Sequence, residues 1–141
     1  LNECERLLVS EGRWEALPLL PGMGRESASV VVMKKTECLY VLGGFDERPV
    51  TVVERLSLRR LEWSDMRLRL PNLIVIVLCF KQDESKFCFV SHEKLYCFNA
   101  ATECSITFMK QLHARHEGGC NPSYYHGGYL YFSNLNLDGA A

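Results

Sequence analysis

The sequence predicts an all-β fold built from repeated antiparallel sheets. Residues 1–14 and 50–63 of the 141-residue chain repeat each other at a shift of 49 positions. The matched residues are Glu5, Arg6, Leu7 and Trp14 in the first copy and Glu54, Arg55, Leu56 and Trp63 in the second. A period of about 40 to 50 residues, with short strands and one Trp per unit, is typical of the blades of a β-propeller.

One complete blade is expected between residues 18 and 66. Its strands are predicted at 28–33, 38–42, 51–58 and, as a short fourth strand, 61–63, because these segments are rich in β-branched and apolar residues and are separated by polar turns. Gly43 and Gly44 end the second strand. Paired glycines let the backbone adopt positive φ or approach a neighbour closely, which a strand near a crowded axis requires.

Parts of other blades are expected on either side. Residues 1–17 would be the outer strands of a preceding blade, and residues 111–141 the inner strands of a further one, at 122–125 and 129–133. Residues 67–110 are interpreted as a degenerate blade, because Ser91-His92 replaces the glycine pair and the Trp is missing. The strands of this degenerate blade are predicted at 73–80, 87–90, 94–99 and 104–108.

The ring is expected to be incomplete or open. Twelve predicted strands correspond to about three blades, whereas propellers normally close with about four to eight. Three arrangements follow: the chain is part of a longer propeller, which we favour; two copies combine into a six-bladed ring; or another element caps the open ends.

The central blade resembles the kelch repeat family over residues 14–71. The residues that carry the resemblance are, in order, Arg25, Ser29-Val30-Val31-Val32, Leu39-Tyr40-Val41-Leu42-Gly43-Gly44, Val53-Glu54-Arg55 and Trp63. The resemblance implies a non-catalytic scaffold whose loops bind a partner protein or peptide. It also leaves two alternatives, the substrate-recognition part of a ubiquitin ligase adaptor and a propeller enzyme of the sugar epimerase or oxidase type.

The binding loops are expected on one face of the propeller. In a four-strand meander, the links from strand two to three and from strand four to the next blade emerge together; here they are 22–27, 45–49, 67–72, 91–94 and 113–121. The candidate partner-binding residues on these loops are Arg25, Ser27, Phe45, Asp46, Arg48, Arg69, Asn72, His92 and Arg115.

Arg25 and Phe45 are the leading candidates among them. The Arg25 guanidinium could bind a carboxylate or phosphate in bidentate geometry, and the alternative is a structural role in bonding carbonyls of the neighbouring loop. Phe45 offers an aromatic anchor beside charges of both signs, Asp46 and Arg48, which is typical of interface hot spots.

No catalytic, metal or cofactor motif stands out, so the chain is predicted not to be an enzyme and to need no cofactor. His113 and His116 lack the second close pair of ligands that structural zinc sites have. Gly22-Met23-Gly24 begins a dinucleotide fingerprint, but Ser27 takes the place of the third glycine and a strand follows.

Composition argues against nucleic acid and membrane partners. The chain has 16 Lys and Arg against 17 Asp and Glu, a net charge of −1, so no general field attracts phosphates or anionic lipids. The tyrosines near the end lack the interleaved basic residues that base stacking needs. The longest apolar run, 73–80, is far shorter than the roughly 20 residues that span a bilayer.

Cysteine and tryptophan usage adds two expectations. Seven Cys without close pairs are typical of reduced thiols that act as small core hydrophobes, which favours a cytoplasmic location. Trp14 and Trp63 are both predicted to pack between neighbouring blades.

Overall fold

The computed structural model describes residues 2–22, 24–71, 78–91, 94–103, 105–112 and 122–132. All regular elements within these ranges are strands, and all of them pair antiparallel in two four-stranded sheets and three hairpins. The predicted all-β propeller segment, with no closed sheet, is confirmed. In the same ranges we find no helix with the length and apolar character needed to cross a membrane.

The first four-stranded sheet follows chain order as a meander. Its strands are β3 (Ser29–Met33), β4 (Cys38–Leu42), β7 (Val52–Ser57) and β8 (Glu62–Arg69). The first three lie within one residue of their predicted positions. The prediction of a short fourth strand at 61–63 is wrong, because β8 continues to Arg69. Its side chains alternate, with Met66 and Leu68 packed against the core and their neighbours exposed, and this two-residue period sustains the strand.

The second four-stranded sheet has the same order. Its strands are β9 (Leu78–Lys81), β10 (Lys86–Ser91), β11 (Lys94–Asn99) and β12 (Ile106–Gln111). The two central strands agree with prediction to within one residue, whereas β12 begins two residues later than expected. Of the predicted first strand at 73–80, only the last three residues lie in the described part of the chain.

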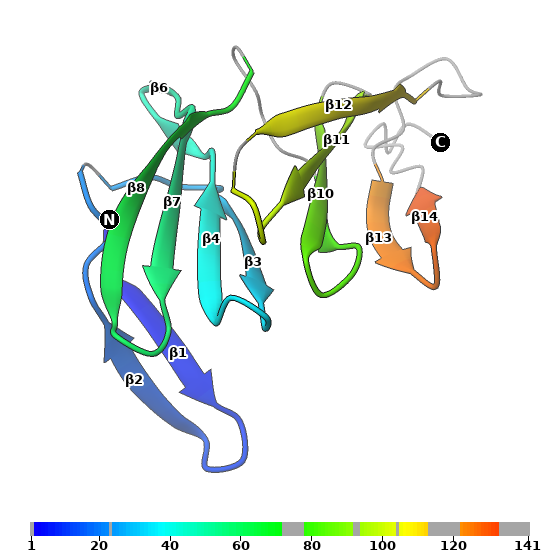
Figure 1. Ribbon diagram of the computed structural model, residues 1–141. Helices are drawn as coiled ribbons and strands as arrows, with labels where there is room; N and C mark the ends of the chain where they lie inside the picture. Colours follow the sequence, from blue (N-terminus) through cyan, green and yellow to red (C-terminus); the bar gives the residue numbers. More distant parts are fainter. Residues whose placement is uncertain are drawn as a thin grey trace, which may run out of the picture.

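Three hairpins complete the described chain. They are β1 (Cys4–Leu8) with β2 (Arg13–Leu17), β5 (Phe45–Asp46) with β6 (Arg48–Pro49), and β13 (Pro122–His126) with β14 (Tyr129–Phe132). The small β5–β6 hairpin replaces the predicted irregular loop. The hairpins β1–β2 and β13–β14 lie at opposite ends of the row formed by the two sheets (Figure 1).

The hydrophobic core lies between the two four-stranded sheets. Tyr40 of the first sheet packs against Phe87 and Phe98 of the second, with ring centroids 5.4 and 5.7 Å away. The Tyr40 hydroxyl donates a 2.6 Å hydrogen bond to Glu103, and burial, reinforced by this carboxylate, raises the pKa of Tyr40. Arg55 pairs with the same Glu103 at 2.5 Å, so a polar network joins the sheets beside the aromatic contacts.

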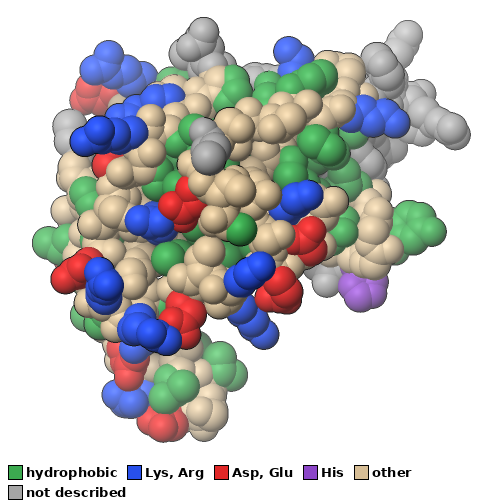
Figure 2. Space-filling view, viewed as in Figure 1, with side chains coloured by type: hydrophobic (Ala, Val, Ile, Leu, Met, Phe, Trp, Pro, Cys, Tyr) green, Lys and Arg blue, Asp and Glu red, His purple; other side chains and the backbone are tan. Residues whose placement is uncertain are grey.

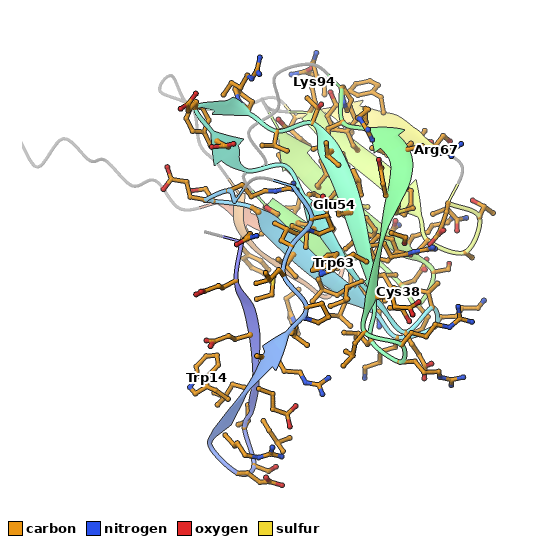
Figure 3. All side chains as sticks on the ribbon, turned by 90° about the vertical axis from the view of Figure 1, so that its left-hand side faces the viewer. Trp14, Cys38, Glu54, Trp63, Arg67 and Lys94 are labelled. Atoms are coloured by element: carbon orange, nitrogen blue, oxygen red, sulfur yellow. The ribbon has the colours of Figure 1, made fainter. Side chains whose placement is uncertain are left out.

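The two tryptophans have different environments. Trp63 is half-buried, and its Nε1 donates a 3.0 Å hydrogen bond to the carbonyl of Pro18, which ties β8 to the segment after β2. Trp14 does not pack between blades within the described residues, which differs from the prediction: it is 64% exposed and lies on the outer side of the β1–β2 hairpin (Figure 3). On the first sheet, the equivalent Trp63 contacts the segment after β2, whereas no described strand covers the face that carries Trp14.

The described cysteines are free thiols, and Cys38, Cys88 and Cys97 are buried as expected. Burial raises the pKa of both Cys79 and Cys88 to about 12. Because the thiolate is the reactive form, we expect neither residue to react with iodoacetamide at pH 8 in the folded protein. Peptide mapping by mass spectrometry checks this, with urea-unfolded protein as the control; native-state labelling at the unfolded rate would contradict it.

Candidate protein-binding pocket

Two of the loops that the sequence assigned to one face meet in an open pocket of about 380 Å³. An antiparallel bridge joins them: the Glu26 amide donates to the Phe45 carbonyl at 3.0 Å, and the Phe45 amide donates to the Glu26 carbonyl at 2.9 Å. The lining residues are Gly24, Arg25, Glu26, Phe45, Asp46 and Glu47. The structure therefore brings together three of the predicted site residues, Arg25, Phe45 and Asp46.

The glycine pair makes this bridge possible. Gly44 has a φ of +96°, and a Cβ at this position would lie 2.9 Å from the Glu26 carbonyl oxygen. A larger residue would thus be strained by its backbone and would also push the two loops apart. The close approach that the sequence led us to expect at Gly43-Gly44 is present.

The β5–β6 hairpin presents the lining side chains. Glu47 forms its tip with a φ of +55°, while Asp46 and Arg48 face each other across it. Phe45 is 42% exposed although it is large and apolar. An exposed aromatic ring held by backbone hydrogen bonds is a suitable anchor for a partner.

Arg25 does not offer its charge to the pocket. Its side chain is only 4% exposed; it pairs with Glu54, which is 8% exposed, and its Nη1 donates to the Gly43 carbonyl at 3.1 Å. Burial raises the pKa of Glu54, and the Arg25 guanidinium opposes this effect. Of the two roles considered for Arg25, these contacts match the structural one, and the Glu54 partner was missed. The repeat could have drawn attention to this glutamate, because Glu54 corresponds to Glu5 in the first copy.

The open side of the pocket carries excess negative charge. Glu26 and Glu47 are exposed and Asp46 is half-buried. These three carboxylates make no ion pair with any described residue, and the Arg25 charge is already balanced by Glu54. Exposed Arg48 stands beside them as the nearby cation. Glu26 was missed from sequence because its place in the pocket depends on the bridge to Phe45.

The other predicted site residues lie elsewhere. Ser27 is exposed with a φ of +57° and follows the bridge without lining the pocket. The prediction that Arg69 lies in a loop is wrong, since it belongs to β8 and pairs with Asp65 at 3.2 Å. Asn72, His92 and Arg115 lie outside the described residues, and their binding role stays a prediction.

A second pocket of about 360 Å³ lies at the opposite end of the first sheet, among the turns. Its lining includes Arg55, Arg59 and Arg60, which would attract an anion. However, Arg55 pairs with Glu103 and Arg59 pairs with Glu37 at 3.0 Å, so much of this positive charge is already balanced. We therefore regard the pocket beside Phe45 as the better candidate.

The meandering four-stranded sheets, the glycine pair at the end of an inner strand and the loops gathered beyond it define a segment of a kelch-type β-propeller. Comparison with known proteins agrees: residues 25–67 match the Kelch motif, and the chain therefore carries a kelch repeat in its first four-stranded sheet.

Comparison of structures supports the same fold. The solved structure of YjhT matches with a TM-score of 0.66 at 14% sequence identity, over 78% of this chain and 45% of the YjhT chain. This chain therefore spans less than half the length of that neighbour. No curated protein matches the sequence significantly.

Proposed function

We propose that the chain is a non-catalytic interaction module that binds a segment of a partner protein in the pocket beside Phe45. The observation that carries this proposal is an exposed aromatic ring, fixed by the Glu26–Phe45 bridge, on the rim of an open pocket. Aromatic side chains held rigidly lose little entropy on binding and supply much of the energy at interface hot spots.

The charge of the pocket indicates the chemistry of the partner. Glu26, Asp46 and Glu47 leave a negative surface beside the ring, with no described ion pair to satisfy it. A complementary segment would carry an apolar residue that packs on Phe45 and an adjacent Lys or Arg that approaches the carboxylates. Such contacts at a rim affect mainly the rate of association and its dependence on salt.

Selection of peptides from a random phage-displayed library against the whole chain tests the proposal. We expect the selected peptides to be enriched in basic residues next to an apolar one. Their affinity should fall at least about tenfold in Phe45→Ala, because loss of a hot-spot side chain costs about 2 kcal/mol or more and each 1.4 kcal/mol is about a factor of ten. Asp46→Asn should weaken binding less and flatten its dependence on salt.

Phe108→Ala is a matched control, because Phe108 is also aromatic and 53% exposed but lies on β12 of the second sheet. It should bind the selected peptides as the wild type does. Peptides that bind Phe45→Ala and wild type equally, or that lose affinity only in Phe108→Ala, would refute the pocket as the binding site. Circular dichroism of each variant separates loss of binding from loss of fold.

A further inference from the structure

We propose that Cys88 and Cys97 form a reversible disulfide, which makes this pair a modification site for small disulfide oxidants. The two residues lie on the neighbouring strands β10 and β11 of the second sheet. Neither of them lines the Phe45 pocket. The inference therefore does not depend on the proposed function.

The strand register places the two cysteines directly opposite each other. Cys88 and Cys97 are partners in the antiparallel pairing of β10 with β11. The Cα atoms of directly opposite residues lie about 4.5 or 5.5 Å apart in antiparallel sheets, and disulfides join Cα atoms that lie about 4.4 to 6.8 Å apart. The backbone therefore already holds the two residues at a separation that a disulfide spans.

The two side chains also converge on each other. Both thiols donate to the same acceptor, Oε1 of Gln82, with Sγ–O distances of 3.3 Å for Cys88 and 3.7 Å for Cys97. The Cys88 and Cys97 thiols are also within hydrogen-bond reach of each other. Two sulfur atoms that share one oxygen and contact each other need only small side-chain rotations to meet.

The surroundings of the pair favour a neutral product. Cys88 is 4% and Cys97 is 9% exposed. Burial, together with the neighbouring Cys97, raises the pKa of Cys88 to about 12, which disfavours a lasting thiolate. Among the described residues, no group of three or more His, Cys, Asp or Glu could hold a metal ion. A disulfide has no charge and needs no third ligand, so it fits this site better than a metal–thiolate complex.

The fold can accept the disulfide without losing its core. Successive side chains of a strand point to opposite faces, and Phe87 and Phe89, on either side of Cys88, belong to the core against the first sheet. The cysteine pair therefore lies on the other face of the second sheet. Gln82 loses both thiol donors on oxidation, but it is exposed, so its carbonyl can accept hydrogen bonds from water instead.

Gln82 also marks the route by which an oxidant reaches the pair, because this exposed side chain covers both buried thiols. Elsewhere on the surface, Lys and Arg side chains are interspersed with Asp and Glu over the face shown in Figure 2. The net charge of the chain is −1. The molecule as a whole therefore neither strongly attracts nor repels a charged oxidant, and access is decided at the pair itself.

Exchange with oxidised glutathione, a low-molecular-weight disulfide, gives a balanced reaction. The sulfur of Cys97, the more exposed of the pair, loses its proton and attacks one glutathione sulfur, and the first glutathione leaves with that proton. The Cys88 sulfur then attacks the Cys97 sulfur, and the second glutathione leaves with the Cys88 proton. The two cysteines lose two electrons, and one glutathione disulfide is reduced to two thiols. The second step needs no reagent from solvent, so it is compatible with protection of Cys88 from iodoacetamide.

Incubation of the whole folded chain with oxidised glutathione tests the proposal. We expect the wild type to lose two hydrogens and to keep no glutathione, which intact mass spectrometry detects. Trypsin cleaves after Lys94, so the peptides that carry Cys88 and Cys97 should remain joined, and fragmentation of the joined peptides identifies the linked residues. Dithiothreitol should restore both thiols. A folded wild type that keeps both thiols, or that links Cys88 to another cysteine, would overturn the proposal.

Three variants then test the roles of the residues. Cys88→Ser should retain one glutathione on Cys97, because the thiol that releases it is missing. Cys38→Ser is the matched control: Cys38 is also buried but lies on β4 of the first sheet, so this variant should form the disulfide at the wild-type rate. Gln82→Ala uncovers the pair and should oxidise faster than the wild type. Loss of two hydrogens in Cys88→Ser, or equal oxidation rates in Gln82→Ala and wild type, would contradict the proposed site and its route. Circular dichroism confirms that each variant is folded.

Discussion

Replacing Arg25 with alanine is expected to lower the free energy of unfolding by about 3 to 5 kcal/mol. The replacement would leave the Glu54 carboxylate buried without its counter-charge, and removing one partner of a buried pair has a cost of this size. Both side chains are nearly inaccessible, at 4% and 8% exposure, and Arg25 also binds the Gly43 carbonyl. Urea unfolding at pH 7, followed by tryptophan fluorescence, measures the change.

The effect of Arg25→Ala should also depend on pH. Burial already raises the pKa of Glu54, and without Arg25 only the weaker attraction of the Arg69 charge would oppose this effect. An acid whose pKa is raised by folding destabilises the protein as pH rises through its ordinary range. The difference between variant and wild type should therefore be full at pH 7 and should shrink as pH falls toward 4, where Glu54 is protonated.

Two further variants distinguish a buried charge from a lost contact. The double variant Arg25→Met with Glu54→Leu removes both charges and fills the space, so it should recover most of the lost stability. Arg48→Ala removes an exposed arginine from the same region and should change stability by less than about 0.5 kcal/mol. A loss below about 1 kcal/mol in Arg25→Ala, or a double variant as unstable as the single one, would contradict the prediction.

The first sheet could be predicted well from the sequence. β4 buries apolar side chains on both of its faces, and β7 buries Val53 and Leu56. Polar turns separate the strands, so the apolar pattern and the β propensity of the residues both predict strands here. The continuation of β8 to Arg69 was missed because its apolar positions, Met66 and Leu68, alternate with Arg67 and Arg69, and these charges suggested a loop. The alternation of apolar and charged residues was visible in the sequence, and in the structure it sustains the strand in spite of the charges.

The environment of Trp14 could not be predicted in the same way. The repeat correctly places Trp14 opposite Leu7, as Trp63 is placed opposite Leu56. Whether the ring is then covered depends on the neighbouring sheet, and a repeat in one chain does not say which neighbours that chain contains. Local register is encoded in the repeat, while burial depends on tertiary packing.

In the candidate site, too, the local feature could be predicted from the sequence and the contact between distant residues could not. The glycine pair predicted a close approach of loops, because its chemistry is local, and Gly44 meets the Glu26 carbonyl as expected. The pairing of Arg25 with Glu54 was missed, since it joins residues 29 positions apart. That contact changes the charge expected for the site: because Glu54 balances the buried Arg25, the pocket is negative through Glu26, Asp46 and Glu47, whereas the sequence indicated charges of both signs.

Replacing Phe87 with alanine is expected to cost about 3 to 5 kcal/mol, because the change removes a fully buried ring and leaves a cavity that the sheets can fill only in part. Phe87 is 0% exposed and packs 4.9 Å from Phe98 and 5.4 Å from Tyr40. Phe87→Leu keeps most of the volume and should cost less than about 1.5 kcal/mol.

The same variant tests whether the two sheets unfold together. In a Trp14→Phe background, fluorescence comes from Trp63, which belongs to the first sheet, whereas Phe87 belongs to the second. If the core between the sheets makes them one cooperative unit, the urea midpoint reported by Trp63 must fall in Phe87→Ala. Met109→Ala, which changes a 54% exposed apolar residue of β12, should leave that midpoint nearly unchanged. An unchanged Trp63 transition in Phe87→Ala would mean that the sheets fold independently, and the inter-sheet core would then contribute little to stability.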